Sequence, residues 1–555
     1  MTTTPAAAGR AGAAETAVPA DPSAATRPPT RDAAWRAAAW ARLDEPWDIV
    51  VIGGGVTGAG ILRLAGRLGL RGLLLEQRDI AWGTSSRSSK LVHGGLRYLK
   101  QFQVKLTWEA VRERERLIRE APGLVEELGF LMPNYRGDST GPLAYRAGLT
   151  LYDLLAGRRT HRHYRADDVV LRAPHLRRDG LLGGFVYADA RTDDARLTLR
   201  VVLEAIEDGA EVLTYARAEA LLRGASGQVA GVAVRDLVGG RTAEVRAPIV
   251  INATGAWADV LRSGVGARPR IRPLRGSHII FPLWRIPVAE AISFAHPVDQ
   301  RPLFLFPWEG STLFGTTDVD HGQPLDEEPR MSGAEADYLM AALTARLPDL
   351  DLRLEDATSS FAGVRPVVGT GKADPSKESR DHVVWDEGGL VTVTGGKLTT
   401  FGIIARDAFR SIRSRLPGHV GRVERRPMFD PAGAPAVAPG VALDEALVAR
   451  LVGRYGAATG ELLAAAGPGE LEPVPGTPTL WAELRWAARA ERVVHLEDLL
   501  LRRTRLGLLA EQGGLGHLAR IREVCGPELG WDDARWASET AAYEALWRSD
   551  YSLPG

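Results

Sequence analysis

The chain has 555 residues, 45% hydrophobic and 25% charged, the composition of an ordinary globular protein with room for two or three domains. Its 69 basic and 69 acidic residues leave no formal net charge, so nucleic acid would gain no general electrostatic hold on it. A single cysteine, Cys525, excludes a disulfide framework and a Cys-x-x-Cys metal or iron–sulfur site, and it fits a reducing, cytoplasmic setting. We expect no metal site.

The start of the chain differs in composition from the rest. From Met1 to about Arg31 it is rich in Ala, Thr and Pro and lacks the continuous apolar core of a secretory signal. We predict a disordered segment over 1–44.

The most informative segment follows directly. An apolar strand at 48–52 enters the turn Gly53-Gly54-Gly55-Val56-Thr57-Gly58, a helix follows, and a second strand at 73–75 ends at Glu76. In such a Gly-x-Gly-x-x-Gly turn the glycines allow a tight bend, close approach of a pyrophosphate and close packing of helix on strand. The helix N-terminus then faces the phosphates, and an acid near this spacing binds a ribose. The pattern predicts a dinucleotide site with ligands Gly53, Gly55, Gly58 and Glu76.

Two further segments favour FAD over NAD. The run 84–98 contains small hydroxyl residues and glycines that can pass close to a flat ring, and its candidate ligands are Thr84, Ser85, Ser88 and Ser89. A later strand, 249–252, ends in Ala253-Thr254-Gly255, which resembles the second FAD-contacting element of two-dinucleotide-fold flavoproteins. No second Gly-x-Gly-x-x-Gly turn is apparent between a strand and a helix, so we expect the electrons to come from the substrate.

The remaining pattern predicts an α/β fold, α+β overall. Antiparallel strand signals between 211 and 315, including a hairpin at 232–246, indicate a substrate domain inserted into a Rossmann-like FAD-binding domain. Strands and glycine turns at 361–401 would close the FAD part, and helical periodicity dominates after a Pro/Ala/Gly linker. We predict a discontinuous oxidoreductase domain over 45–427 and an all-helical domain over 428–555.

From about Trp47 onward the chain resembles the FAD-dependent glycerol-3-phosphate dehydrogenases, flavoenzymes that pass electrons to quinone. The matching segments, in the family's order, are Ser88 to Tyr98, Thr192 to Leu197, Gly276 to Ile279, Gly315 to Asp318, Ala362 to Pro366, Ser379 to Asp381 and Gly395 to Thr400. The segment from Glu497 to Leu506 also resembles the family's helical domain. Phe401 departs from the pattern, since a Tyr often stands there.

The resemblance implies oxidation of sn-glycerol 3-phosphate at C2 to dihydroxyacetone phosphate, with hydride passing to flavin N5 and electrons to a membrane quinone. This chemistry needs cations for the phosphate, a base for the C2 hydroxyl and positive charge beside the reduced flavin. We expect His93 to be the base, because a neutral imidazole can take a hydroxyl proton near pH 7. The expected catalytic residues are His93, Arg365 and Lys397, and the expected substrate ligands are Arg97, Tyr98, His278, Arg365, Arg380 and Lys397. Further FAD contacts would come from Ala253, Gly255, Gly363, Lys397, Leu398 and Thr399.

Several alternatives stay open. An oxidase of the same fold would return electrons to oxygen, and a glycine-oxidase type of enzyme would bind an amino or hydroxy acid through one arginine. The pair Asp193-Asp194 is interpreted as a buried loop anchor bonded to Arg196 in preference to an acid–base or metal pair. The charge run 112–116 is interpreted as a solvated helix face.

The electron acceptor places the protein at a membrane surface. No stretch approaches the roughly 18 apolar residues of a spanning helix, so a quinone reductase would bind peripherally, on the inner face of the cell membrane. The predicted contact is one face of a helix within 143–165, formed by Tyr145, Leu149, Tyr152 and Leu155 and followed by the basic residues Arg158, Arg159, Arg162 and Arg165. The alternative is a buried helix with a solvated basic loop. A homodimer is a further expectation.

Overall fold

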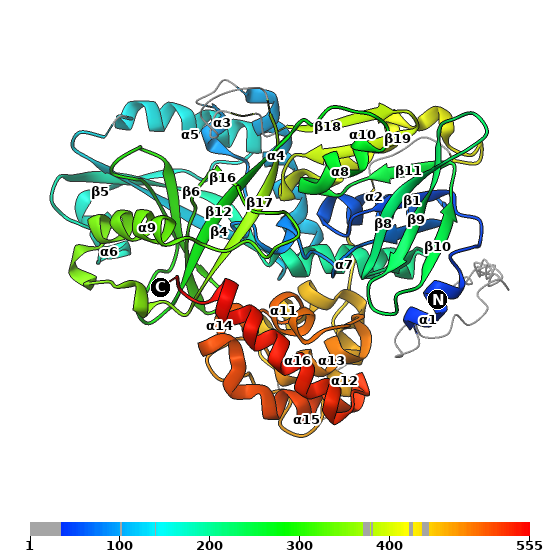
Figure 1. The fold of residues 1–555 in the computed structure, drawn as a ribbon. Helices are drawn as coiled ribbons and strands as arrows, with labels where there is room; N and C mark the ends of the chain where they lie inside the picture. The colour runs from blue at the N-terminus through cyan, green and yellow to red at the C-terminus, as the bar shows by residue number, and fades with distance from the viewer. Residues whose placement is uncertain are drawn as a thin grey trace, which may run out of the picture.

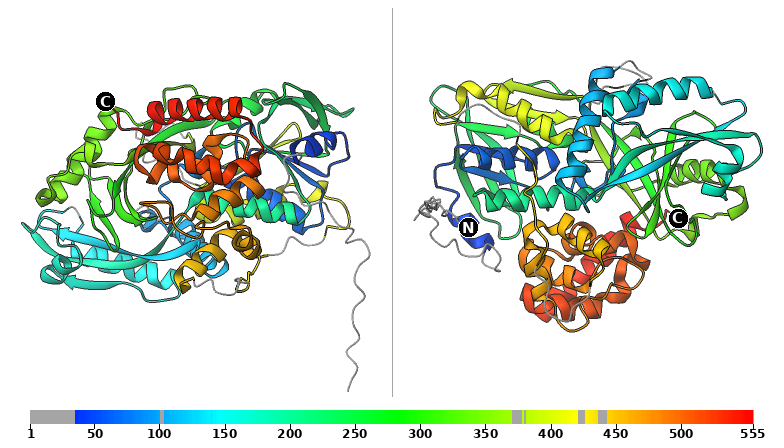
Figure 2. Two further views of the ribbon diagram at one scale, coloured as in Figure 1. Left: turned by 90° about the horizontal axis from the view of Figure 1, so that it is seen from below. Right: turned by 180° about the vertical axis from the view of Figure 1, so that it is seen from behind.

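The computed structural model describes residues 35–99, 103–138, 140–369, 378, 381–420, 426–435 and 443–554. Two sheet-containing halves lie side by side, and a helical domain packs beneath both of them (Figures 1 and 2). Most of the segment expected to be disordered lies outside the described residues. Its end forms helix α1 (Trp35–Ala41), so the expectation of disorder does not hold there.

The first half is built on a mostly parallel sheet with strand order β18-β19-β11-β1-β2-β7. The strands are β1 (Ile49–Ile52), β2 (Gly72–Leu75), β7 (Glu211–Leu213), β11 (Ile249–Asn252), β18 (His382–Glu387) and β19 (Leu390–Gly395). The central strand β1 pairs in parallel with β2 and β11, so the carboxyl ends of all three meet at one edge of the sheet. Ligands of such sheets bind at that edge.

Both faces of this sheet are covered, and the alternation of side chains along β1 shows how. Ile49 and Val51 point into a core shared with α2 (Val56–Arg67), α7 (Asp194–Glu207) and α10 (Phe401–Ser411). Val50 and Ile52 point to the other face, which packs on a three-stranded antiparallel sheet. That small sheet consists of β8 (Ala216–Arg223), β9 (Val229–Asp236) and β10 (Thr242–Arg246). A strand buried on both faces explains the unbroken apolar run in the sequence.

The second half is a larger, mainly antiparallel sheet with strand order β16-β12-β15-β14-β13-β4-β6-β3, in which β17 also pairs with β12 and β5 with β6. Its strands are β3 (Leu91–Val92), β4 (Val125–Tyr135), β5 (Arg162–Arg165), β6 (Leu181–Thr192), β12 (Ile271–Pro282), β13 (Ala291–Ala295), β14 (Pro302–Trp308), β15 (Ser311–Gly315), β16 (Val319–Asp320) and β17 (Ser359–Val368). One face packs on α6 (Ala166–Arg172) and α9 (Gly333–Arg346). The other face packs on α4 (Val104–Glu120), α5 (Pro142–Ala156) and the C-terminal helices.

The C-terminal helices form the third part of the molecule. They are α11 (Glu445–Tyr455), α12 (Thr459–Ala465), α13 (Trp481–Ala490), a π-helical turn (Asp498–Arg503), α14 (Leu506–Leu509), α15 (Leu518–Leu529) and α16 (Asp533–Leu546). Leu499 and Leu500 share one core with Phe361 of β17 and Trp308 of β14. This part is therefore docked through a continuous apolar interface and is not a loosely attached appendage.

The structure corrects the predicted membrane face of α5. Leu149 and Tyr152 are fully buried in the core of the second half, and the Tyr152 hydroxyl donates to Asp189, 2.8 Å away. The opposite face of the helix is exposed instead, with Leu143 82% and Leu154 76% accessible. The apolar residues do recur with a helical period, but the face of α5 that they form packs into the protein core.

The interpretation of the charge run 112–116 as a solvated face is also wrong for three of its five residues. Glu113, Arg114 and Arg116 are buried, and Arg114 reaches Asp189 on β6 with Nη1 2.5 Å from the carboxylate. Burial lowers the pKa of the Arg114 guanidinium, but the charge and hydrogen bond of Asp189, together with Tyr152 and Glu115, outweigh burial, so the pKa is raised. A partner on a distant strand thus turned an apparently solvated residue into a core residue.

The glycine turn leaves no room for a side chain at Gly58. A Cβ on Gly58 would lie 1.9 Å from the carbonyl oxygen of Gly53, whereas a Cβ on Gly148, in α5, would meet nothing within 4 Å. We expect Gly58→Ala to impair folding and abolish dinucleotide binding. Gly148→Ala should raise the free energy of unfolding by up to about 1 kcal/mol, because alanine favours helix. Thermal unfolding and flavin content of the two purified variants test this, and equal behaviour would contradict it.

Candidate active site

The predicted dinucleotide ligands meet at the carboxyl edge of the parallel sheet. Gly53 has a positive φ of 109°, and a Cβ there would lie 2.6 Å from the carbonyl oxygen of Ala253, at the end of β11. Gly55 stands at the N-terminus of α2, where the Val56 N–H donates to the Ser85 hydroxyl over 2.9 Å. Backbone donors and a hydroxyl at a helix N-terminus suit a pyrophosphate.

Glu76 stands at the end of β2, as the ribose assignment requires. Its carboxylate accepts from the Gly54 N–H over 2.6 Å and from the Arg78 N–H over 2.8 Å. Burial raises the pKa of this carboxyl, and the two backbone hydrogen bonds oppose that rise. A carboxylate fixed on two sides offers its remaining lone pairs to the hydroxyls of a ribose.

The loop 84–92 is held by hydrogen bonds to both halves of the molecule. Thr84 Oγ1 donates to the Val364 carbonyl over 2.5 Å, and Ser88 donates to Asp194 through its N–H and its hydroxyl over 2.9 and 2.7 Å. Ser89 Oγ lies 2.8 Å from His278 Nε2. These hydroxyls already have protein partners, so Ser88 and Ser89 hold the loop, and their contact with FAD stays a prediction.

The side chain of Arg365 is held in place by residues of neighbouring strands. It lies on β17 and pairs in register with Leu274 of β12, and its guanidinium covers Gly276, where a Cβ would stand 2.3 Å from Nη2. Nη1 lies 3.1 Å from Asp318 Oδ1, and Nη2 donates to Thr316 Oγ1 over 3.1 Å. A side chain at 276 would therefore displace the guanidinium from this place. The segment Gly315 to Asp318 belongs to the family resemblance, but the pattern alone assigns Asp318 no role.

His278 provides an uncharged imidazole beside this arginine. The ring is buried, stacks on Phe361 with centroids 4.7 Å apart, and leaves Nδ1 without a hydrogen-bond partner among the described residues. Burial, and next the charges of Arg365 and Lys90, hold the pKa of His278 well below its ordinary value. Since buried polar atoms are nearly always satisfied, Nδ1 is an atom that a bound group can complete.

A second group of predicted residues gathers where the loop continues. Lys397 Nζ lies 3.8 Å from the centre of the Tyr98 ring, and Thr399 Oγ1 donates to the His93 carbonyl over 3.3 Å. Tyr98 is buried, and His93 is half-buried. Arg97 is described only through its place in α3 (Leu96–Leu99), and Arg380 lies outside the described residues. Within those limits, the segments far apart in sequence do converge on the loop that begins at Thr84.

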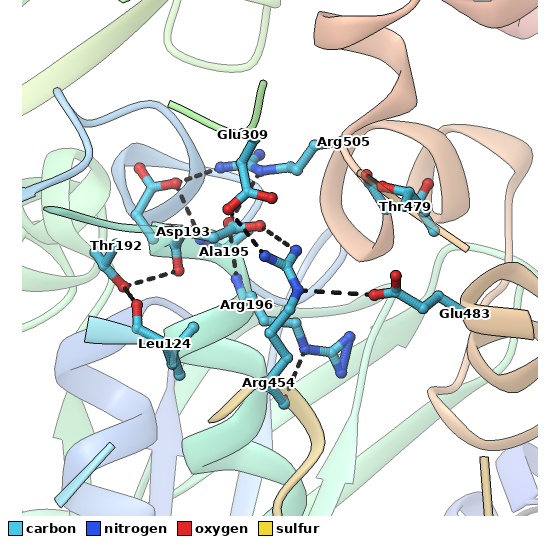
Figure 3. A network of polar contacts seen from close by, with 12 residues as sticks. Leu124, Thr192, Asp193, Ala195, Arg196, Glu309, Arg454, Thr479, Glu483 and Arg505 are labelled. Carbon is cyan, nitrogen blue, oxygen red and sulfur yellow. Dashed lines mark hydrogen bonds and ion pairs between the residues drawn. The ribbon is translucent and has the colours of Figure 1, made fainter. Parts of the chain in front are cut away.

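The acid pair Asp193-Asp194 is a buried anchor, as interpreted, but its partner is different. Asp193 caps α7 and lies between Arg454 Nη2, at 2.8 Å, and Arg505 Nε, at 3.1 Å (Figure 3). The side chain of Arg196 pairs with Glu491 instead. No group of three or more His, Cys, Asp or Glu residues in the described part of the chain is placed to hold a metal ion.

Comparison with known proteins agrees with this geometry. Residues 48–407 match the family described as FAD dependent oxidoreductase, and residues 415–536 match the C-terminal domain of alpha-glycerophosphate oxidase. Glycerol-3-phosphate dehydrogenase 2 of Mycobacterium tuberculosis (strain ATCC 25618 / H37Rv) is 37% identical over 92% of this chain and 90% of its own length. The chain belongs to the FAD-dependent glycerol-3-phosphate dehydrogenase family.

Two further relatives extend the comparison. The aerobic glycerol-3-phosphate dehydrogenase of Bacillus subtilis (strain 168) is 38% identical over 67% of each chain. The glycerol-3-phosphate dehydrogenase from Bacillus halodurans, solved in complex with FAD, superposes with a TM-score of 0.74 at 26% identity and covers 93% of this chain and 98% of its own. The family resemblance and the predicted α/β fold with a C-terminal helical domain are confirmed.

The ribose assignment of Glu76 can be tested by removing its charge. Glu76→Gln keeps the size of the side chain but loses the acceptor for one of two backbone N–H groups and weakens its hold on a ribose. Charge-assisted hydrogen bonds contribute about 1.5–3 kcal/mol, so the FAD Kd should rise about tenfold or more. Fluorescence of released FAD measures this. Asp48→Asn is the matched control, since Asp48 also accepts a backbone N–H, from Arg71, away from the turn.

Proposed function

We propose that this protein oxidises glycerol 3-phosphate at C2 to dihydroxyacetone phosphate with FAD as its cofactor. The observation that carries the proposal is the guanidinium of Arg365, fixed by Asp318 and Thr316 beside the neutral ring of His278. A fixed cation next to an uncharged hydrogen-bonding group matches a substrate that carries both a phosphate and a hydroxyl. The FAD-dependent family and a relative aligned over 92% of the chain support the same substrate.

The residues divide the work by charge. Arg365 binds the phosphate, together with Arg97 and Arg380, because a planar guanidinium can bond two phosphate oxygens at once. His93 takes the proton of the C2 hydroxyl, and Tyr98 and His278 orient that end of the substrate by hydrogen bonds. Lys397 supplies positive charge at the cofactor. When bound, FAD supplies the oxidising equivalent by accepting the hydride at N5.

The role of Arg365 has a matched control in the same ion cluster. Arg301 Nη2 lies 2.7 Å from Asp318 Oδ2, so two arginines hold this aspartate from two sides. Arg365→Met should lower kcat/KM for glycerol 3-phosphate at least about tenfold while FAD stays bound. Arg301→Met, which disturbs the same carboxylate, should change kcat/KM far less. Equal losses in the two variants would assign Arg365 a structural role only.

The substrate itself is tested by anaerobic mixing of the purified holoenzyme with glycerol 3-phosphate. We expect the visible flavin absorbance to bleach, as two-electron reduction requires. Bleaching by glycine or another amino acid, without bleaching by glycerol 3-phosphate, would favour the glycine-oxidase alternative.

Lys397→Met should slow the bleaching step itself, because it removes positive charge beside the reduced ring.

For the electron acceptor, a quinone at the inner face of the cell membrane is proposed. No helix in the described ranges is long and apolar enough to cross a membrane. Helix α5 runs along the edge of the molecule opposite the C-terminal helices (Figure 1). Leu143, Ala147, Leu151 and Leu154 form an exposed stripe on this helix. The exposed side chains of Arg159, Arg162 and Arg165 follow it along the chain. Apolar residues flanked by basic ones suit an interface of anionic lipid.

Flotation with anionic vesicles tests this surface. We expect the holoenzyme to float with the vesicles and Leu154→Ser to float less, because a large apolar side chain no longer enters the lipid. Leu171→Ser is the control, since Leu171 is 82% exposed, against 76% for Leu154, but lies on α6, away from the stripe. Indistinguishable flotation of the two variants would remove α5 from the contact. Full turnover in air with stoichiometric peroxide would favour the oxidase alternative.

A further inference from the structure

Three arginines of the C-terminal helical part lie against the FAD half. Arg502 and Arg503 end the π-helical turn, and Arg505 precedes α14. All three side chains are at most 2% exposed. Guanidinium groups buried so deeply are stable only with well-placed carboxylates or carbonyls, so their partners identify what they hold.

The first partner is Asp79, three residues after the ribose-binding Glu76. Arg503 reaches it with Nη1 and Nη2 at 2.6 and 2.8 Å, and Arg502 with Nε at 2.5 Å. Just beyond Asp79, the Ala81 N–H donates to the Gly54 carbonyl of the glycine turn over 3.0 Å. The segment that follows β2 is thus fastened on one side to the nucleotide turn and on the other to the C-terminal helices.

The second partner is the loop 84–92 itself. Arg505 Nη2 donates to the Ser86 carbonyl over 3.0 Å and pairs with Asp194. Asp194 in turn accepts from Ser88 and from Lys90 Nζ, 2.9 Å away, and the same ammonium donates to the Ser86 carbonyl over 2.8 Å. Arg505 therefore contacts the loop directly and also through the carboxylate that fixes Ser88.

A third contact comes from the chain after α16. The Tyr551 hydroxyl lies 3.1 Å from Arg87 Nη2, and both side chains bond Glu328. The Ser360 hydroxyl of β17 donates to the Ser552 carbonyl over 2.8 Å. Three separate positions of the C-terminal part thus converge on the loop and on the strand that carries Arg365.

We propose that Arg505 and Asp194 are positioning residues for the flavin: the C-terminal helical domain sets the conformation of the loop 84–92 and thereby FAD affinity. That domain carries none of the predicted FAD ligands, so its effect passes through the segments it contacts, and Arg505 acts on the loop. The proposal rests on the FAD site and not on the identity of the substrate.

The test measures FAD binding by the full-length protein in the absence of substrate. In Arg505→Met the bonds to Ser86, Asp193 and Asp194 are lost, and we expect the FAD Kd to rise about tenfold or more. The absorbance and circular dichroism bands of the bound flavin should also shift, because the loop beside the ring relaxes. Arg505→Lys keeps the charge but lacks the forked geometry, so it should give an intermediate Kd in a protein that folds more readily.

The matched control is Arg485→Met. Arg485 bonds Glu470 and Glu528, all within the C-terminal helical part, through contacts of 2.7 to 2.8 Å. We expect this variant to lower Tm like Arg505→Met, yet to leave the FAD Kd within about twofold of the parent. The proposal is overturned if the Kd of all three variants follows Tm alone, or if neither Arg505 variant changes the Kd or the flavin spectrum. Neither result bears on glycerol 3-phosphate oxidation, which the bleaching experiment tests separately.

Discussion

The buried ion cluster around Asp193 and Asp194 is the constraint on which the rest of the structure depends. These carboxylates stand where β6 of the second half runs into α7 of the first, and Arg454 and Arg505 reach them from the C-terminal helices. Removing charges from water is costly, and each ion here is stable only while its partners stay in place. The two sheets and the helical part must therefore adopt one relative arrangement, because any other leaves a charge buried without a partner.

That arrangement brings together, at the candidate active site, residues that no single part could supply. The parallel sheet supplies the glycine turn and Glu76, the antiparallel sheet supplies Arg365 and His278, and the loop 84–98 lies between them. The electrostatics follow from the same layout. Burial and neighbouring cations keep His278 neutral, and Asp318 holds Arg365 in place. A charged guanidinium and an uncharged imidazole therefore lie next to each other at fixed positions.

The features that the sequence predicted well are local ones. The glycine turn, its flanking strands and Glu76 lie within one short segment whose geometry follows from residue type and spacing. The resemblance then located His278, Arg365 and Lys397, which the fold does bring to the same loop. The roles of those residues remain predictions, since a side chain's place does not by itself reveal its function.

The errors share one physical cause, a partner that lies far away in the sequence. The apolar period of α5 was correct, but a period cannot tell whether its face meets a protein core or a lipid surface. The sequence does not indicate that Arg114 pairs with Asp189, because Asp189 lies on β6, far along the chain. It likewise does not indicate that the Arg196 side chain pairs with Glu491, which caps the C-terminus of α13, rather than with Asp193. Arg505 lies in the segment Glu497 to Leu506, which resembles the family's helical domain, but nothing in that segment indicates that its partners are Ser86 and Asp194.

The distance along the chain between the loop 84–92 and Arg505, which bonds it, has a consequence for biosynthesis. Arg505 follows Ser86 by 419 residues. At a synthesis rate of about 5–20 residues per second, roughly 20 to 80 seconds separate the emergence of the two from the ribosome. Until Arg505 emerges, the Ser86 carbonyl and the Asp194 carboxylate lack the guanidinium that bonds both of them in the folded protein. If Arg505 positions the loop as proposed above, the nascent chain completes its flavin site only when the last helices arrive, and cofactor capture is a late event in biosynthesis.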